Sequence, residues 1–289
     1  MNQPRNAFCL SLTLALLLTA AAVPAWAQDD TEWRSVDAAS IAYMQLPGGE
    51  AIIELNAEFA PATVAQFKRL VRDGFYDGLD FYRVVDGFVA QGGDGSDMGD
   101  ANSEPMLPAE FERPWSADFA FTSVQKPDMF APETGFIDGF AAGRDMQSRK
   151  VWLTHCPGVI AMARNDGPDT GSTDFYIVIG HAPRYLDRNL TIFGRVVSGM
   201  DVVHRVIRGP SEANGMIAEG EPRTNIEKIV LAEDMPAAER KSVQVTDTSS
   251  AEFGKVLQSR KKRGPPFFHH KPPEVLDVCQ VPVATRIGR

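Results

Sequence analysis

The sequence predicts a mainly β fold, an antiparallel barrel closed by two α-helices. Short runs rich in β-branched and aromatic residues recur along the chain, and clusters of Gly, Pro and Asp separate them. Four of these runs span residues 81–85, 159–164, 174–180 and 191–197. Because only two helical segments accompany these short strands, we expect the helices to cap the ends of a barrel.

The elements follow from local patterns along the chain. Residues 52–55 predict a strand, and Pro61 is well placed in the first turn of a helix. That helix is indicated by apolar residues at helical spacing, which continue until Gly74 supplies a stop: Val64, Phe67, Leu70 and Val71. The same spacing predicts a second helix, from Met200, Val203, Val206 and Ile207. Residues 226–231 predict a last strand.

The N-terminus has the layout of a secretory signal peptide. Residues 1–27 contain Arg5, an apolar run over residues 7–23, and Ala-Trp-Ala immediately before Gln28. A membrane anchor is the alternative, but the run is short for a span and no charged stop follows it. We therefore expect cleavage, a periplasmic or secreted protein, and no attachment to the membrane afterwards.

Beyond this signal, the sequence divides into a linker over residues 28–39, a domain over residues 40–235 and a C-terminal extension over residues 236–289. The extension contains a short amphipathic helix, predicted by a capping-box pattern of Ser249 and Glu252 followed by apolar residues at helical spacing: Phe253, Val256 and Leu257.

Charge and cysteine content limit the partners and the compartment. The chain has 38 acidic and 29 basic residues, and its net charge of −9 argues against nucleic acid and anionic membranes as partners. Cys9 lies in the apolar N-terminal run, which leaves Cys156 and Cys279. An exported protein could join them in a disulfide, although their spacing leaves the pairing open.

The segment FYRVVDGFVAQGGD, residues 81–94, carries the most informative chemistry. Arg83 and Gln91 are its groups for holding a polar ligand, and the apolar Phe88 and Val89 lie between them. The segment has no nucleophile, acid–base pair or metal-ligand set. Rotation about a peptide bond before proline needs none of these. Its barrier of about 20 kcal/mol comes from amide resonance, and a fixed donor such as arginine would stabilise the twisted prolyl nitrogen.

Four blocks together resemble the cyclophilin-type peptidyl-prolyl isomerases, and the likeness covers about residues 40–233. They are the segment above and the segments FAPATVAQFKRLVRDGFYDG (59–78), GVIAMARNDGPDTGSTDFYIVIG (158–180) and LTIFGRVVSGMDVVHRVI (190–207). The resemblance implies a closed eight-stranded antiparallel barrel, proline-containing polypeptide clients and no cofactor. We also expect a monomer.

The resemblance assigns roles to individual residues. Arg83 matches the catalytic arginine of the family, and Gln91 matches its groove glutamine. The remaining matches form the substrate-binding surface. Tyr82 stands where histidine is frequent, Phe88 and Val89 match the floor of the proline pocket, and Ala163 and Arg164 match the edge strand that pairs with substrate backbone.

Other binding positions depart from the family pattern. Asp174 occupies a second glutamine position, Tyr176 the place of a pocket phenylalanine, Tyr185 an aromatic position and Leu190 that of a pocket histidine. A buried tyrosine hydroxyl at position 176 would need a partner. The carboxylate of Asp174 would either pair with Arg83 and compete with substrate, or favour clients with a basic residue near the proline.

A long insertion over about residues 95–157 exceeds what compact cyclophilins have. It contains many Pro, Gly and aromatic residues, so we expect a loop packed on the barrel. This loop extends the peptide groove, covers part of it, or only buries its own side chains.

Two functions fit the sequence. The first is an isomerase that assists the folding of exported proteins. The second is a proline-peptide-binding chaperone or scaffold of the same fold with weak or no turnover.

Overall fold

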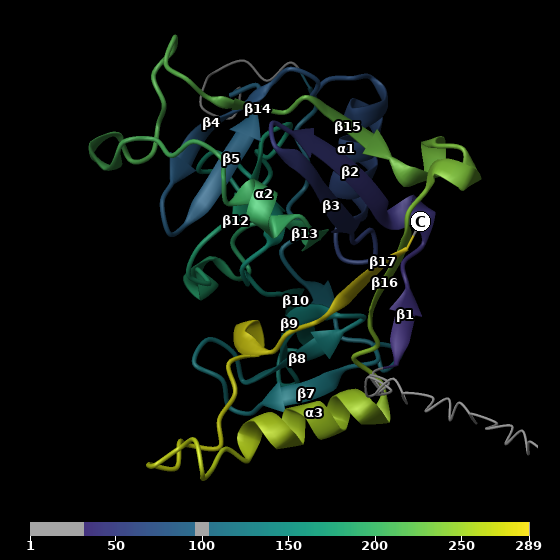
Figure 1. The fold of residues 1–289 in the computed structure, drawn as a ribbon, viewed down its shortest axis with the longest axis vertical. Coiled ribbons are helices and arrows are strands. Elements are labelled where there is room, and N and C mark those ends of the chain that lie inside the picture. Colours follow the sequence, from purple (N-terminus) through teal and green to yellow (C-terminus); the bar gives the residue numbers. More distant parts are fainter. Residues whose placement is uncertain (1–31, 96–103, 289) are drawn as a thin grey trace, which may run out of the picture. The chain divides into compact units, whose positions relative to one another are not determined.

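The computed structural model describes residues 32–95 and 104–288, so the predicted signal peptide lies outside the described residues. A nine-stranded antiparallel sheet, in the order β14-β4-β5-β12-β11-β13-β3-β2-β15, forms the main part of the fold (Figure 1). Its strands are β2 (Ile41–Leu46), β3 (Gly49–Leu55), β4 (Asp80–Val85), β5 (Val89–Gly93), β11 (Val159–Met162), β12 (Phe175–Val178), β13 (Ile192–Ser198), β14 (Thr224–Asn225) and β15 (Lys228–Leu231). The mainly β class expected from the sequence is confirmed.

The two edge strands of this sheet, β14 and β15, are neighbours in the chain. β14 pairs with β4 and β15 pairs with β2. Between them, the Ile226 amide donates to the carbonyl of Leu79, and the Glu227 amide donates to that of Gln45. The segment therefore pairs with both edges of the sheet. Nine strands are seen where eight were expected, because the change of partner divides this segment in two.

Helices α1 (Pro61–Arg72) and α2 (Met200–Val203) pack their apolar residues into the core enclosed by this sheet. The prediction for α1 is confirmed, with Pro61 in its first turn. α2 is shorter than expected. The Arg208 side chain donates to the carbonyls of His204 and Val206 just beyond it, and Ile207 is exposed. Within the described residues, no helix has the length and apolar character needed to cross a bilayer.

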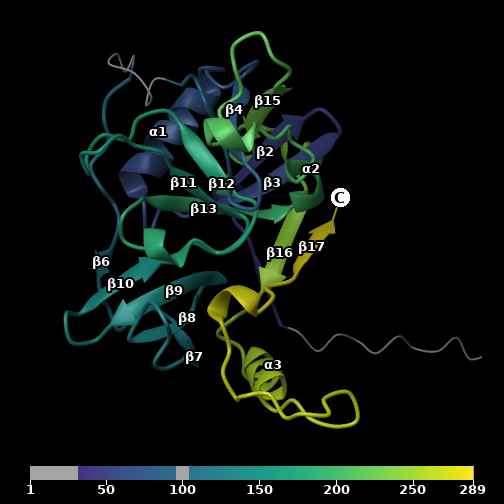
Figure 2. The ribbon, with the colours of Figure 1, turned by 90° about the vertical axis from the view of Figure 1, so that its left-hand side faces the viewer.

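The described residues of the insertion are folded into a sheet, so the expected loop is wrong for them. It forms a five-stranded antiparallel sheet in the order β6-β10-β9-β8-β7. Its strands are β6 (Arg113–Pro114), β7 (Thr122–Gln125), β8 (Glu133–Ile137), β9 (Phe140–Asp145) and β10 (Lys150–Leu153). Both ribbon views place this sheet beside the nine-stranded one (Figures 1 and 2). Apolar residues of the two sheets form one cluster, which confirms that the insertion packs on the barrel.

A carboxylate of the insertion also caps α1. Glu110 accepts hydrogen bonds from the backbone amides of Ala62 and Thr63, at 2.9 and 3.0 Å. The first amides of a helix have no partner within the helix and favour a negative charge nearby. Ala60, the residue before the helix, provides no side-chain cap of its own. The insertion therefore supplies the N-terminal cap of α1.

The C-terminal extension pairs with the start of the described chain. A three-stranded sheet has the order β1-β16-β17, with β1 (Trp33–Ser35), β16 (Ser242–Thr246) and β17 (Thr285–Gly288). Residues 33–35 of the expected linker are thus part of a sheet. A disulfide joins Cys156, after β10, to Cys279 in the extension, which settles the pairing that the sequence left open.

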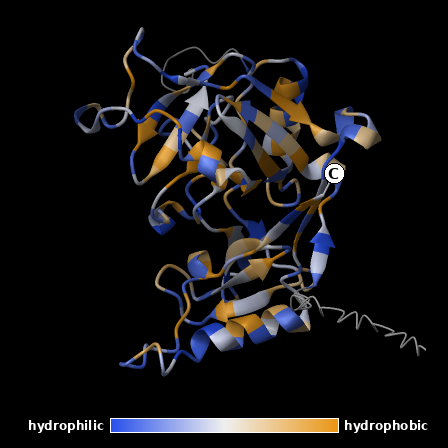
Figure 3. Ribbon diagram, viewed as in Figure 1, coloured by the Kyte–Doolittle hydropathy of each residue, from blue (hydrophilic) through white to orange (hydrophobic). Residues whose placement is uncertain are grey.

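Helix α3 (Ala251–Lys261) confirms the predicted C-terminal helix, with one correction. Its cap is Ser250, whose hydroxyl accepts from the Phe253 amide, and not Ser249. Hydrophobic and hydrophilic residues alternate along α3 in Figure 3. Phe253 and Leu257 are buried, and the Phe253 ring lies edge-on against Phe136 of the insertion sheet.

Candidate active site

Three of the predicted site residues lie in one row across the nine-stranded sheet. Arg83 on β4 pairs with Gln91 on β5, and Gln91 pairs with Tyr176 on β12. Tyr176 pairs in turn with Ala161 on β11. Side chains at directly paired positions share one face of a sheet. The row therefore gathers arginine, glutamine and tyrosine from segments up to 93 residues apart on one face.

A bulge in β4 brings Tyr82 to the same group. The register of β4 against β5 shifts between Asp80 and Arg83, so Phe81 and Tyr82 face a single residue, Gly92. A bulge of this kind redirects side chains relative to regular alternation. The Phe81 side chain enters the barrel core, whereas the Tyr82 hydroxyl reaches the Gln91 side chain.

Four polar side chains form a continuous hydrogen-bonded chain at this site. Arg83 donates from Nη1 to Oε1 of Gln91 at 3.0 Å, and Gln91 donates from Nε2 to the Tyr82 hydroxyl at 2.6 Å. Tyr82 donates to Oδ2 of Asp174 at 2.6 Å. Arg83 Nε also donates to the carbonyl of Asn214 at 3.1 Å. The alternative of a direct Asp174–Arg83 pair is wrong, because Asp174 reaches Arg83 only through Tyr82 and Gln91.

Asp174 is a fully buried carboxylate. Burial raises its pKa from 3.8 to about 6; the Tyr82 hydrogen bond opposes this rise, and the nearby negative charge of Asp94 adds to it. The Gly95 amide also donates to Oδ1 at 3.2 Å. Close packing leaves no room for a Cβ at Gly93, which would lie 2.0 Å from that oxygen.

The buried Tyr176 hydroxyl has a partner that was missed from the sequence. It lies 2.8 Å from Nε2 of His155, and the two rings are nearly parallel. His155 lies next to Cys156 at the end of the insertion. Its Nδ1 lies 3.1 Å from Asp187 Oδ1, so the tautomer that donates to this carboxylate from Nδ1 accepts the hydrogen bond of the Tyr176 hydroxyl at Nε2. Burial raises the pKa of Tyr176 well above its usual value, and the charge of Asp187 adds to this.

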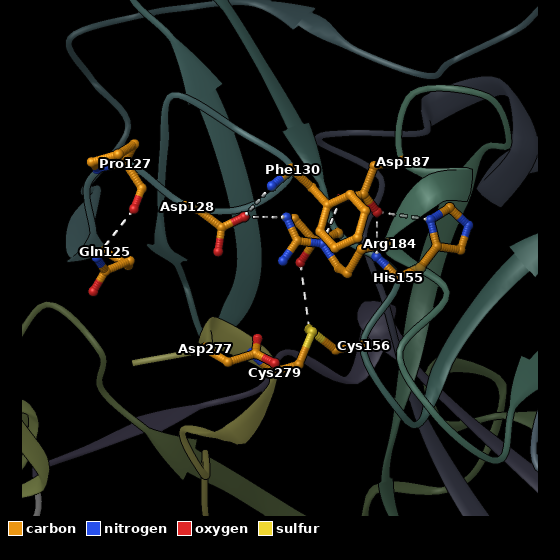
Figure 4. Close-up of polar contacts among 11 residues, drawn as sticks. Gln125, Pro127, Asp128, Phe130, His155, Cys156, Arg184, Asp187, Asp277 and Cys279 are labelled. Carbon is orange, nitrogen blue, oxygen red and sulfur yellow. Dashed lines mark hydrogen bonds and ion pairs between the residues drawn. A yellow bond between two sulfur atoms is a disulfide. The ribbon is translucent and has the colours of Figure 1, made fainter. Parts of the chain in front are cut away.

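A buried ion-pair network continues from Asp187 into the insertion (Figure 4). Arg184 donates to Asp187 at 2.6 Å and to Asp128, between β7 and β8, at 3.2 Å. The Phe130 ring lies beside the guanidinium, 5.4 Å from it. All three charged side chains are at most 7% exposed. Two residues of the insertion therefore contact the site and its surroundings: His155 bonds to Tyr176, and Asp128 pairs with Arg184.

The apolar residues of the predicted slot belong to one cluster with Tyr176. Val89 and Ala163 are buried, whereas Phe88 and Leu190 are half-buried and pack against the same cluster. Tyr185 is 66% exposed and lines a separate 630 Å³ cavity with Phe111 and Phe130 of the insertion. Tyr185 is thus open to solvent, whereas Val89 and Ala163 are covered.

Ala163 and Arg164 differ from the edge strand that the resemblance implies. The Ala163 amide donates to the carbonyl of Asp174 at 2.9 Å, so this N–H is not available to a substrate backbone. The Arg164 guanidinium donates to backbone carbonyls, including that of Asn189 at 3.0 Å, and lies over the Phe111 ring. Its contacts bind local backbone and the insertion.

Nothing in the described residues forms a metal centre. No group of three or more His, Cys, Asp or Glu side chains there could hold an ion. Asp97 and Asp100, the acidic residues that follow Asp94 in the sequence, lie outside the described residues.

Comparison with known proteins identifies the family of this site. The family model of cyclophilin type peptidyl-prolyl cis-trans isomerases matches residues 41–230. A probable peptidyl-prolyl cis-trans isomerase of Brucella suis is 30% identical over 210 residues, which cover 68% of this chain and 84% of that protein. An isomerase of Schizosaccharomyces pombe is 32% identical over 163 residues, covering 56% of this chain and 82% of that one.

A solved structure extends the similarity beyond the barrel. A cyclophilin from Hirschia baltica matches with a TM-score of 0.72 and 27% identity, and the match covers 89% of this chain and 93% of that one. The family match spans about two thirds of the sequence and contains the row of Arg83, Gln91 and Tyr176. This chain therefore belongs to the cyclophilin-type peptidyl-prolyl cis-trans isomerases.

Proposed function

We propose that this protein accelerates cis–trans isomerisation of X–Pro bonds in exported polypeptides, with Arg83 as the donor to the twisted prolyl amide. One observation carries the proposal. Gln91 and the Asn214 carbonyl hold Nη1 and Nε of Arg83, whereas Nη2 has no hydrogen-bond or ion-pair partner among the described residues. The guanidinium is thus fixed in place with donors left for a ligand.

A fixed guanidinium suits this reaction because no bond is made or broken. Twisting the prolyl amide ends its resonance and returns a lone pair to nitrogen. A donor aimed at that nitrogen binds the twisted form better than either planar form, which is the requirement for catalysis. Arginine stays charged at every working pH. Preorganised donors of this kind contribute roughly 100- to 1,000-fold to the rate in other enzymes.

Gln91 has two roles in this scheme. One lone pair of its Oε1 accepts from Arg83, and one proton of its Nε2 is donated to Tyr82. An amide has a second lone pair and a second N–H. These remaining groups would hold substrate backbone while the first pair orients Arg83. Phe88, Val89, Tyr176 and Leu190 would contact the proline ring, through the apolar cluster that they share.

Export is the second part of the proposal, and two features support it. Residues 1–27 have the layout of a cleavable signal. The Cys156–Cys279 disulfide suits an oxidising compartment. We propose that the mature chain begins at Gln28, acts as a monomer in the periplasm or outside the cell, and needs no cofactor. The net charge of −9 argues against nucleic acid as a partner.

A proline-peptide-binding chaperone of the same fold is the second candidate function. The departures of Asp174 and Leu190 from the pattern that the resemblance implies favour it, because they change the surroundings of the proline slot and would weaken turnover. Both functions predict binding of proline-containing segments. Only the isomerase predicts faster exchange between the cis and trans forms of a bound peptide.

Exchange NMR on a short Xaa-Pro peptide tests the proposal. We expect the wild type to accelerate exchange and Arg83→Ala to reduce kcat/KM roughly 100-fold or more. Arg83→Lys keeps the charge but loses the planar fork, and should fall between them. Arg205→Ala is the matched control, since Arg205 pairs with Asp201 on the surface. If Arg83→Ala retains full exchange activity, Arg83 is not the catalytic donor. Binding without exchange in the wild type would instead establish the chaperone function.

A further inference from the structure

Two departures from the family pattern contact each other directly. Tyr82 stands where histidine is frequent and Asp174 where glutamine is frequent, and their side chains share a 2.6 Å hydrogen bond. We propose that Tyr82 and Asp174 form a positioning pair that orients Gln91, and through Gln91 orients Arg83, for prolyl isomerisation. This inference rests on the proposed function and names two further residues on which the reaction depends.

Asp174 determines which group donates in each of the hydrogen bonds that link it through Tyr82 and Gln91 to Arg83. An ionised carboxylate only accepts hydrogen bonds, so the Tyr82 hydroxyl must place its proton toward Asp174. The Tyr82 oxygen can then accept, and it accepts from Nε2 of Gln91 at 2.6 Å. With the amide held this way, Oε1 faces Arg83 at 3.0 Å. A flipped amide would place N–H groups against the guanidinium, so Asp174 selects the orientation that holds Arg83.

The position of Asp174 is itself fixed by its surroundings. Its side chain is fully buried, and the Gly95 amide holds Oδ1. Gly93 approaches Oδ1 so closely that a Cβ there would clash, and its φ of +141° is one that other residues rarely adopt. The carboxylate cannot swing away from Tyr82 without moving this backbone. Buried, satisfied polar networks of this kind hold a single arrangement.

The charged groups around Asp174 determine the expected pH dependence. Asp94 faces it across the Thr173 hydroxyl, which donates to Asp94 at 2.8 Å. The Asp80–Arg223 pair and Tyr82 line the same cavity as Asp94. Arg83 is reached only through Gln91. A protonated Asp174 is a weaker acceptor for Tyr82, so activity should fall as the pH drops through the raised pKa of Asp174, about 6.

The test compares kcat/KM for an Xaa-Pro peptide at pH 8.0 and pH 5.5 by exchange NMR. We expect a fall of about threefold in the wild type between these values and no fall in Asp174→Asn, which cannot titrate. Tyr82→Phe, which cannot accept from Gln91, should lose about tenfold at pH 8.0. Tyr43→Phe is the matched control, because the buried Tyr43 hydroxyl on β2 accepts from the backbone amide of Lys241 and takes no part in the hydrogen bonds of Arg83, Gln91, Tyr82 and Asp174.

A combined substitution separates positioning from simple damage. Tyr82→His with Asp174→Gln restores the residue types frequent in the family at both positions. If the two residues act as a pair, this double variant should be more active than either single variant. The Gln91 side-chain amide signals should also shift with pH in the wild type and stay constant in Asp174→Asn.

The outcomes distinguish this inference from the proposed function. If Arg83→Ala abolishes activity while Tyr82→Phe and Asp174→Asn keep wild-type kcat/KM and pH profile, the positioning pair is overturned and the catalytic arginine stands. If Arg83→Ala keeps full activity, the proposed role of Arg83 fails. Should Asp174→Asn not fold, Tyr82→Phe decides alone, with an amide NMR spectrum to check its fold.

Discussion

Replacing Asp174 by asparagine should change how the stability of this protein depends on pH. Burial raises the pKa of Asp174 in the folded state from 3.8 to about 6. The folded state then binds a proton more tightly than the unfolded chain does. The stabilisation linked to this proton is fully present below pH 3.8 and is lost as the pH rises through about 6.

The size of the effect follows from the change in proton affinity. Each tenfold change corresponds to about 1.4 kcal/mol, so the change from 3.8 to about 6 corresponds to about 3 kcal/mol in all. Between pH 4 and pH 8 most of that difference is realised. The wild type should therefore lose about 2 to 3 kcal/mol of unfolding free energy relative to Asp174→Asn over this range. Any constant offset from altered hydrogen bonds with Tyr82 or Gly95 cancels in the comparison.

Urea unfolding at five pH values between 4 and 8, under oxidising conditions that keep the disulfide, measures this difference. Asp201→Asn is the control, because Asp201 is exposed and its Arg205 partner lowers its pKa. The wild type should lose no unfolding free energy relative to Asp201→Asn between pH 4 and pH 8. A wild-type minus Asp174→Asn difference that stays constant from pH 4 to pH 8 would refute a buried carboxylate with a raised pKa.

Two further predictions concern the insertion and the extension. Arg184→Ala leaves Asp128 and Asp187 buried without their cation and should destabilise the fold by about 3 to 5 kcal/mol. The control is Arg188→Ala, which removes an exposed arginine and should cost less than about 1 kcal/mol in the same urea titration. Equal losses in the two variants would contradict a buried network. Cys279→Ser removes a disulfide whose cysteines are 123 residues apart and should lower the unfolding free energy by about 2 to 5 kcal/mol. Thermal unfolding with and without reductant checks this, because the wild type should lose stability on reduction and the variant should not.

The barrel could be predicted where its pattern is local. The helical spacing of Val64, Phe67 and Leu70 is contained within a few residues, and α1 formed where it was expected. Strands β2 and β5, the three-stranded sheet of β1, β16 and β17, and the whole insertion sheet were missed. Strands β8 and β9 contain Gly135 and Gly143 and few β-branched residues, so their local preference is weak. Their structure depends on pairing and on packing against other elements, which sequence patterns of single strands do not record.

In the site, too, contacts within one motif could be predicted, and contacts between distant segments could not. Arg83 and Gln91 lie eight residues apart in one motif, and the structure joins them by a hydrogen bond. Tyr82 and Asp174 are 92 residues apart, and their contact depends on the bulge in β4. No single-sequence pattern reports such a bulge, so Tyr82 was not among the partners considered for the carboxylate, and the direct pair with Arg83 was one of two alternatives left open. The need of the Tyr176 hydroxyl for a partner was predicted, but its identity required the fold.

The contact between His155 and Tyr176 connects the insertion to the chemistry of the slot. A buried hydroxyl without a partner costs about 1 to 3 kcal/mol, and Tyr176 avoids this cost only because His155 lies where the insertion ends. Asp187 orients His155, and Arg184 joins Asp187 to Asp128 within the insertion. Tyrosine at position 176 therefore depends on the folded insertion, which supplies the hydrogen-bond partner of its hydroxyl. A relative that lacks both His155 and the insertion should be more stable with phenylalanine at this position, because the ring is kept and no hydroxyl is buried without a partner.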